Sequence, residues 1–419
     1  MKTLTLNASQ KMKQTPIGEI PVDWRIAKFG EITRIAEGQV DPTITPYLDY
    51  LHIGPENISS DTGHLTGLRT ARQLALISGK YLFDEEAIVY SKIRPNLNKV
   101  CIPGFKGICS ADAYPVWPAT ASLQRNYLFY FMLSAIFVKQ AVEMSMRTGL
   151  PKINRGDLNS ILVVVPPVQE QQAITAILTR WSSAISQGER LVDAKRQSKA
   201  GWMQRLLTGK RRFPTFGKGG KAGSNGWKTY HLGELFDERV EIGRDDLPLL
   251  SITGDRGVVD RNDLDKKDTS NADKGKYLRI APGDIGYNTM RMWQGVSALS
   301  ELEGIVSPAY TVCTPKADKI DGRFAAYLFK FQPVVHRFWR YSQGMVDDTL
   351  NLKFHNFAEV RVKIPSVEEQ REIAALLSGC DSEIILLEKE LEALREQKKG
   401  LMQKLLTGKV RVHRGKEGQ

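Results

Sequence analysis

The sequence predicts an α+β protein made of two equivalent halves, each a variable α/β domain followed by a long helix, with the two helices paired as a coiled coil. Residues 166–212 recur as 365–411 at a constant offset of 199 residues, from Pro166 to Pro365. Both copies close on Leu-Leu-Thr-Gly-Lys, at 206–210 and at 405–409. Apolar residues in each copy recur at steps of three and four, the pattern of a coiled-coil seam. A duplication of this length indicates two equivalent halves.

The duplicated segment has start and stop signals of a helix at both ends. Ser366-Val367-Glu368-Glu369 is typical of a capping box, and Gly209 and Gly408 stand where a helix end needs a left-handed residue. Each helix is then about 40 residues, or roughly 60 Å, long. Two ordinary core helices are the alternative, but they explain the length and the seam poorly. The residues expected on the seam are Ile174, Leu178, Trp181, Ile185, Ile373, Leu377, Ile384, Leu387, Leu391 and Leu394.

The first copy of the seam is expected to be the weaker one. Gly188 and Lys195 stand where the second copy has Leu387 and Leu394. A glycine and a charged residue remove apolar contact from a coiled-coil seam.

The repeat continues, with a drifting offset, into the regions before the helices. Trp24 and Trp227 are 203 residues apart, whereas Tyr90 and Tyr287 are 197 apart. Variable loops on a shared scaffold produce such drift. Short β-rich runs, such as residues 87–90, 114–117 and 161–165, alternate with helical runs in both regions, which favours a mostly antiparallel sheet with helices. We therefore expect a flexible N-terminus (1–15), a first variable domain (16–165), a central helix (166–209), a basic glycine-rich linker (210–226), a second variable domain (227–364), a distal helix (365–408) and a basic tail (409–419).

Composition favours a nucleic-acid-binding protein of a reducing compartment. The chain of 419 residues carries a formal net charge of +12, the kind of basic excess that attracts nucleic acid, although many basic proteins bind none. The four cysteines form no CxxC pair, which argues against a zinc module or a disulfide scaffold. Residues 1–18 lack the apolar core of a signal peptide, and the longest apolar run, Tyr127 to Val138, is too short to span a bilayer. We expect a cytoplasmic protein.

The sequence shows no catalytic constellation. The six histidines are scattered, and no HExxH, Walker box or acidic nuclease cluster stands out. Val165-Pro166-Pro167-Val168 lacks both the polar and the aromatic end of an amino-methyltransferase motif, and its prolines suit a strand end and a helix start. The glycines of the linker lack the Gly-Lys-Ser/Thr of a phosphate loop. We expect no catalysis and no metal site in this chain.

Clusters of basic and amide residues point to DNA recognition. Arginine and lysine suit guanine and phosphate groups, and asparagine suits adenine. For one such residue a solvated surface charge is an equally good interpretation, but the set recurs in both halves. The candidates are Lys92, Arg94, Asn96, Asn98, Lys99, Arg147, Lys152, Asn154 and Arg155 in the first half, and Arg279, Asn288, Arg291, Lys353 and His355 in the second.

The order of these elements resembles a known family. A variable domain, a Pro-x-Val-x-Glu-Gln helix ending in Leu-Leu-Thr-Gly-Lys, and a second copy of both resemble the specificity subunit of type I restriction-modification systems. The resemblance covers residues 17–409, and the Ile-Pro-Val-Asp-Trp start (20–24) and Arg94-Pro95-Asn96-Leu97 add to it.

The resemblance implies two target recognition domains, each reading one half of a split, asymmetric DNA site. It implies that the two helices form an antiparallel pair, which sets the spacer between the half-sites and docks two modification subunits. Restriction/translocase subunits would join that core. S-adenosylmethionine would be held by the modification subunit, and ATP and Mg by the nuclease subunit, so the resemblance implies that this chain binds no cofactor itself.

Two other classes stay open at this stage. One is a duplicated scaffold that recruits protein partners without reading DNA. The other is a stand-alone methyltransferase or nuclease, which the missing motifs disfavour. The bases recognised depend on loop geometry, which the sequence does not give.

Overall fold

The computed structural model describes residues 4–7, 11–145, 151–216, 226–244, 246–264, 274–346 and 349–414. The chain divides into two compact units, the first made of residues 1–189 and 390–419 and the second of residues 190–389. Each unit therefore holds one variable domain and a part of both long helices.

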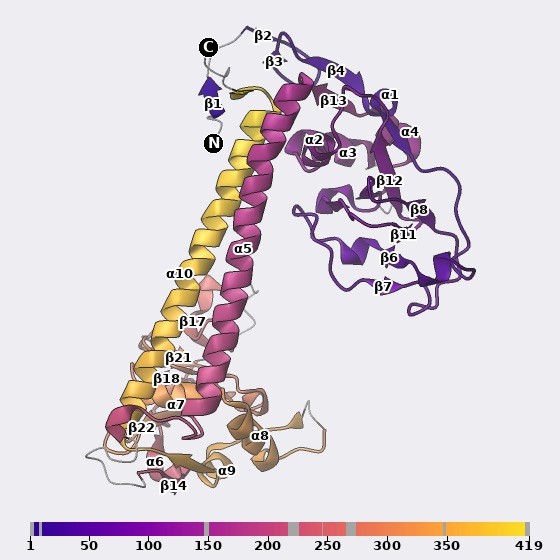
Figure 1. The fold of residues 1–419 in the computed structure, drawn as a ribbon. Coiled ribbons are helices and arrows are strands. Elements are labelled where there is room, and N and C mark those ends of the chain that lie inside the picture. Colours follow the sequence, from indigo (N-terminus) through magenta and orange to yellow (C-terminus); the bar gives the residue numbers. More distant parts are fainter. Residues whose placement is uncertain are drawn as a thin grey trace. The chain divides into compact units, whose positions relative to one another are not determined.

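The described residues of the first unit form two four-stranded sheets, three two-stranded sheets and four short helices beside the long ones (Figure 1). The sheets have the strand orders β10-β9-β12-β5 and β7-β6-β11-β8, and β6 with β11 is a parallel pair in an otherwise antiparallel arrangement. The strands are β1 (Leu4–Asn7), β2 (Met12–Lys13), β3 (Ile20–Pro21), β4 (Arg25–Lys28), β5 (Thr33–Ile35), β6 (Leu51–Ile53), β7 (Arg69–Thr70), β8 (Tyr81–Phe83), β9 (Ile88–Ser91), β10 (Val100–Cys101), β11 (Gly107–Cys109), β12 (Ala113–Pro118), β13 (Leu162–Val165) and β24 (Arg411–Arg414). The helices are α1 (Phe29–Ile32), α2 (Arg125–Met132), α3 (Ala135–Ser145) and α4 (Arg155–Ser160).

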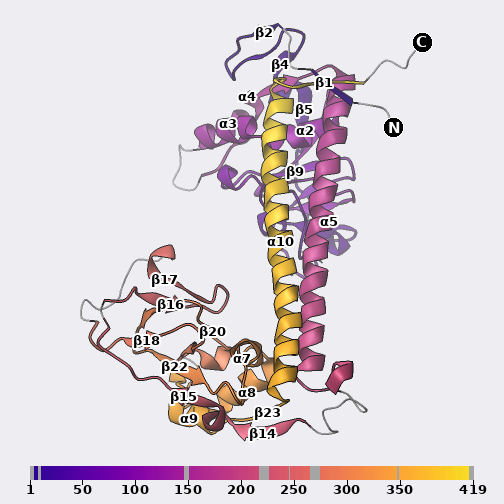
Figure 2. The same cartoon turned by 90° about the vertical axis from the view of Figure 1, so that its left-hand side faces the viewer.

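Among its described residues the second unit has a similar plan, with one four-stranded sheet and three two-stranded pairs (Figure 2). Its main sheet has the order β15-β22-β19-β20, and the pairs β16-β17, β18-β21 and β14-β23 are all antiparallel. The strands are β14 (Lys228–His231), β15 (Phe236–Glu238), β16 (Leu250–Ile252), β17 (Val258–Asp260), β18 (Leu278–Ile280), β19 (Ile285–Asn288), β20 (Ser297–Leu299), β21 (Gly304–Val306), β22 (Tyr310–Pro315) and β23 (Arg361–Ile364). The helices are α6 (Leu232–Leu235), α7 (Gly322–Leu328), α8 (Gln332–Tyr341) and α9 (Phe354–Ala358).

The long apolar run of the first half forms two helices rather than one. Its residues Tyr127, Leu128 and Phe131 are buried in the core. Ser134 separates α2 from α3 because its hydroxyl donates to the Phe131 carbonyl at 2.6 Å and accepts from the Phe137 amide at 3.4 Å. Among the described residues no single helix is long and apolar enough to cross a membrane, and only α2 and α3 taken together as a bent pair reach that length and apolarity.

The two predicted long helices are present, α5 (Val168–Leu206, 39 residues) and α10 (Val367–Leu406, 40 residues). In the first unit Ile174 of α5 shares a core cluster with Leu405 of α10, and in the second unit Leu206 of α5 clusters with Ile373 of α10. The start of one helix therefore packs beside the end of the other, which makes the pair antiparallel. Gly209 and Gly408 lie just after the helix ends with φ values of +69° and +71°, the left-handed conformation that the stop signals predicted.

The predicted seam residues lie at the helix pair, although the two weak positions are compensated. Trp181, Leu387 and Leu394 are half-buried and the other predicted seam residues are buried. A Cβ on Gly188 would come within 3.1 Å of the Leu391 side chain, so Leu391 already fills the space beside this glycine. Lys195 leaves the apolar seam and pairs with Glu383 at 2.5 Å.

Both ends of the chain contribute strands to the first unit. Residues 1–15 and 409–419 were expected as a flexible N-terminus and a basic tail. Residues 1–3, 8–10 and 415–419 lie outside the described residues, and in the described part β1 pairs with β24 and β2 pairs with β3. Leu4-Thr5-Leu6 alternates apolar and polar residues, which suits a strand once a partner is available. Residues 217–225 of the predicted linker lie outside the described residues.

A buried ion pair joins the start of each long helix to the segment after the end of the other. In the first unit the Arg411 guanidinium binds both carboxylate oxygens of Glu170, at 2.6 and 2.7 Å. It also donates to Asp23 at 2.9 and 2.8 Å, and Trp24 Nε1 donates to Glu170 at 2.9 Å. The Arg411 and Glu170 side chains are only 5% and 6% exposed.

The second unit holds the simpler counterpart of this ion pair. The Arg212 guanidinium binds both oxygens of Glu369, at 2.9 and 2.6 Å. Trp227 occupies the position of Trp24, but its indole nitrogen is buried and has no hydrogen-bond partner among the residues that the structure describes. The two units thus share the arginine–glutamate pair and differ in what surrounds it.

Candidate nucleic-acid interface

The two basic segments predicted in the first half lie against each other in the first unit. The Arg94 amide donates to the Pro151 carbonyl at 2.7 Å, and the Ile153 amide donates to the Lys92 carbonyl at 2.9 Å. Ile93 and Lys152 form an isolated β-bridge. Residues 92–99 and 151–155, about 60 positions apart in the sequence, therefore form one surface, which we call the first basic loop pair.

An unusual backbone turn holds this loop pair in shape. Arg94 and Asn98 have φ values of +49° and +47° on either side of a 3-10 turn, Pro95–Leu97. Left-handed conformations cost free energy for residues other than glycine and persist where the surroundings impose them. Asn98 is buried, and its amide donates to Asp61 at 2.8 Å and to the Leu133 carbonyl at 3.0 Å. The turn leaves Arg94 and Asn96 exposed.

Other predicted DNA-binding residues of this half are engaged inside the unit. Lys92 lies 4.8 Å and Arg155 lies 5.5 Å from the Tyr114 ring centroid. Burial, followed by the positive charge of Lys152, lowers the pKa of Lys92. Arg155 donates to the Ile35 and Ala36 carbonyls, Lys99 donates to the Pro55 carbonyl, and Asn154 caps α4 by accepting from the Asp157 amide. Lys152 is 48% exposed beside Asp112, and Arg147 lies outside the described residues.

The second unit brings the predicted residues Asn288, Arg291, Lys353 and His355 together in the same way. The Leu352 amide donates to the Thr289 carbonyl at 2.8 Å, which sets the segment before Lys353 beside the segment that leads to Arg291. Arg291, Lys353 and His355 are exposed, while Asn288 accepts from the Met290 amide. We call residues 288–291 and 351–355 the second basic loop pair.

Arg279 is not part of this surface. It lies on β18, where its guanidinium binds Glu241 at 2.9 Å and Glu303 at 2.5 Å. These hydrogen bonds raise the pKa of Arg279, and the two carboxylates neutralise its charge. Arg279 is thus held by two carboxylates, whereas Arg291 is exposed on the second basic loop pair.

The sequence did not single out the outer face of α8. Trp339 is 45% exposed and stacks on His336 with ring centroids 5.5 Å apart, and α8 packs against the 3-10 turn Met292–Gln294 that follows Arg291. An aromatic side chain on the polar face of an amphipathic helix is the signal that would have marked this surface.

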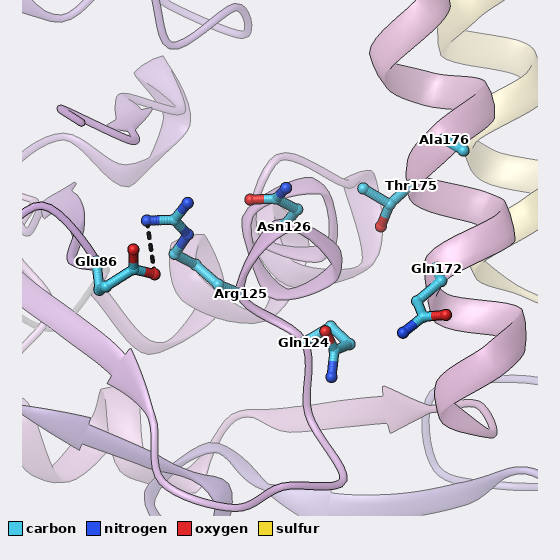
Figure 3. A pocket seen from close by; sticks show the side chains of 7 residues that line it. All are labelled: Glu86, Gln124, Arg125, Asn126, Gln172, Thr175 and Ala176. Carbon is cyan, nitrogen blue, oxygen red and sulfur yellow. Dashed lines mark ion pairs between the residues drawn. The ribbon is translucent and has the colours of Figure 1, made fainter.

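A pocket of about 380 Å³ lies in the first unit where α2 meets α5 (Figure 3). Its lining residues are Glu86, Gln124, Arg125, Asn126, Gln172, Thr175 and Ala176. Arg125 pairs with Glu86 at 3.0 Å, and the Thr175 hydroxyl is buried with no hydrogen-bond partner in the described part of the chain. The lining contains no cysteine or histidine, and the described residues form no His, Cys, Asp or Glu cluster suited to a metal ion.

The fold and the loop pairs define a class of protein with two tandem recognition modules joined by paired helices. The model of the type I restriction modification DNA specificity domain matches residues 21–192 and 225–396. Because these matches cover most of the chain, the protein belongs to the type I restriction-modification specificity family, with two tandem copies of its domain.

Individual relatives agree with this family. The chain is 36% identical over 168 residues to the type I restriction enzyme EcoDI specificity subunit of Escherichia coli, a match that covers 40% of this chain and 37% of that protein. It is 24% identical over 418 residues to the MjaVIII specificity subunit of Methanocaldococcus jannaschii, and this match covers 94% of both proteins.

Solved structures show the same fold. A chain from a study of complex assembly and conformational transition of the type I R-M system matches with a TM-score of 0.57 at 18% identity, covering 93% of this chain and 99% of that one. The S subunit of a type I system from M. genitalium matches with a TM-score of 0.55 at 16% identity, covering 91% and 96% of the two chains.

Proposed function

We propose that this chain is the DNA sequence-specificity subunit of a type I restriction-modification complex and that each variable domain reads one half of a bipartite, asymmetric site. The observation that carries the proposal is the duplication of the specificity domain at residues 21–192 and 225–396. Each copy has its own basic loop pair within its own unit. Two independent modules in one chain suit two different half-sites, as half-site proteins use two copies of one module.

We propose that the subunit itself is non-catalytic and that its helices dock two modification subunits. S-adenosylmethionine would then be held by those subunits, and ATP and Mg by the restriction/translocase subunits. The chain would work in the cytoplasm, where bacterial and archaeal DNA lies. Both long helices contribute residues to each unit, so each unit can offer a partner its own part of the helix pair.

Methylome sequencing of a host that expresses this chain with its modification subunit tests the proposal. A bipartite methylated motif should appear only when this chain is present. Exchange of residues 227–364 for another variable domain should replace one half of the motif and keep the other. An assembled complex that methylates no motif would instead favour a scaffold without DNA reading.

Arg94→Ala should weaken binding of the half-site read by the first domain. Arg94 is exposed on a rigid turn, and loss of a base-reading arginine costs about 1–3 kcal/mol. Arg72→Ala is the matched control, because it removes the same charge from the same unit at a site paired with Asp49. Binding titrations with duplexes altered in one half-site measure the effect, and equal losses in the two variants would contradict a specific role for Arg94.

A further inference from the structure

Gln171, in the first turn of α5, ties the long helix to the recognition domain of the first unit. Its side chain is fully buried. Its Oε1 accepts from the Gln124 amide at 2.9 Å, at the residue that precedes α2. Its Nε2 donates to the Ser122 carbonyl at 2.7 Å and to the Pro166 carbonyl at 2.8 Å. One carboxamide thus joins the start of α2 to the start of α5.

Gln370 makes the same three hydrogen bonds in the second unit. Its Oε1 accepts from the Asp321 amide at 2.9 Å, and its Nε2 donates to the Lys319 and Pro365 carbonyls at 3.0 and 2.9 Å. It is also fully buried. Asp321 precedes α7 as Gln124 precedes α2. The junction is therefore identical in the two units.

All partners of these two glutamines are backbone groups. The junction therefore does not depend on which side chains the variable domain carries at residues 122 and 124 or 319 and 321. A buried amide with three fixed partners leaves unpaired polar groups if it is replaced, so it strongly specifies one geometry. The glutamine can hold domains of different sequence at the same angle to the helix.

A second link between domain and helix differs between the units. The Tyr130 hydroxyl contacts Thr179 and Ser182 of α5, whereas the hydroxyl that contacts Ser378 and Asp381 of α10 belongs to Tyr327. Tyr327 corresponds to Tyr127 rather than to Tyr130 in the repeat. The tyrosine link has shifted by about one helical turn, while the glutamine link is unchanged.

We propose that Gln171 and Gln370 are positioning residues for bipartite recognition, which fix each recognition domain on its own long helix and thereby fix the spacing at which the half-sites are read. This role rests on the proposed function. Each glutamine acts on its own unit. Neither residue contacts DNA, and both act through the geometry of the domain that does.

Gln171→Met and Gln370→Met, each in the complex with modification subunits, test this role. Methionine keeps the approximate volume and removes all three hydrogen bonds. Methylation rates are measured on duplexes with the native spacer and with spacers one or two base pairs longer or shorter. Gln172→Met is the matched control, because Gln172 is the next residue on α5, is exposed, and has no hydrogen-bond partner among the described residues.

We expect the methylation rate to depend less on spacer length in both variants than in the unmodified complex. The rate on the native spacer should fall by roughly tenfold or more, as small misplacements do, while the rates on neighbouring spacers fall less or rise. Thermal melting of each complex is recorded alongside. The control should keep the native profile.

Two results would overturn the role. One is a uniform loss at all spacers, or failure of both variants to assemble, which would make the glutamines ordinary stabilising residues. The other is an unchanged profile in an assembled variant. If only one variant assembles, its methylation rates alone decide the test, because both residues are proposed to have the same role. Failure of the proposed function is distinguishable, because the unmodified complex would then methylate no bipartite site.

Discussion

Replacement of Arg411 by methionine is expected to destabilise the first unit by about 3–5 kcal/mol, the cost of leaving a buried charge without its partner. Glu170 is 6% exposed and would keep only the Trp24 indole among the side-chain donors that now bind it. Removal of one partner costs more than the pair contributes, because the remaining charge is desolvated and unpaired.

The double variant with Glu170→Met as well should recover most of that stability. Replacement of both members of a buried ion pair by apolar residues is often neutral or stabilising, although the Trp24 indole would lose its acceptor. Denaturant unfolding followed by separate probes in each unit measures the change, since two units need not unfold in one step. A loss below about 1 kcal/mol for the single variant would contradict a buried network.

Arg212→Met is the matched substitution in the second unit. Glu369 is 1% exposed, so it also becomes a buried unpaired carboxylate. Arg212 is 18% exposed and lacks the counterpart of Asp23, whereas Arg411 binds two carboxylates. We expect a smaller loss than for Arg411→Met, and the reverse order would mean that Asp23 adds nothing to the first network.

The sequence predicted the long helices well because their signals are local and duplicated. A seam at steps of three and four, and glycines at 209 and 408, define the helices without knowledge of the rest of the chain. The strands predicted near 87–90, 114–117 and 161–165 are β9, β12 and β13. The period of the apolar residues and the glycines and prolines at the ends suffice to predict such elements.

The ion pairs, and the contacts that the basic loops make with the interior, join residues far apart in the sequence. Local sequence patterns therefore do not predict them. Arg411 and Glu170 are 241 positions apart and meet only because the helices are antiparallel. Asn98 matches an adenine-reading residue by type, but its left-handed backbone turns its amide toward Asp61 in the interior. Arg279 has two carboxylates as neighbours that lie 38 and 24 positions away. Residue type alone does not distinguish Asn98 and Arg279, whose side chains are engaged inside their own unit, from the exposed Arg94.

Insertion of one helical turn into both long helices is expected to lengthen the recognised spacer by about two base pairs while both half-sites stay the same. Four residues add about 6 Å to a helix, and one base pair occupies about 3.4 Å of the duplex. The inserts follow Gln187 in α5 and Leu391 in α10, because a Cβ on the next residue of α5, Gly188, would lie 3.1 Å from Leu391. A four-residue insert is a stutter, which locally unwinds a coiled coil but keeps the seam.

The same four residues inserted in α5 alone are the control for this prediction. That variant displaces one side of the seam against the other, so it should lose stability and methylation rather than acquire a new spacer. Methylome sequencing of hosts that carry each variant reads the half-sites and the spacer together. If the double insert methylates the original spacer, the helices do not set the distance between half-sites, and the fixed length of the duplicated segment must serve the docking of partner subunits alone.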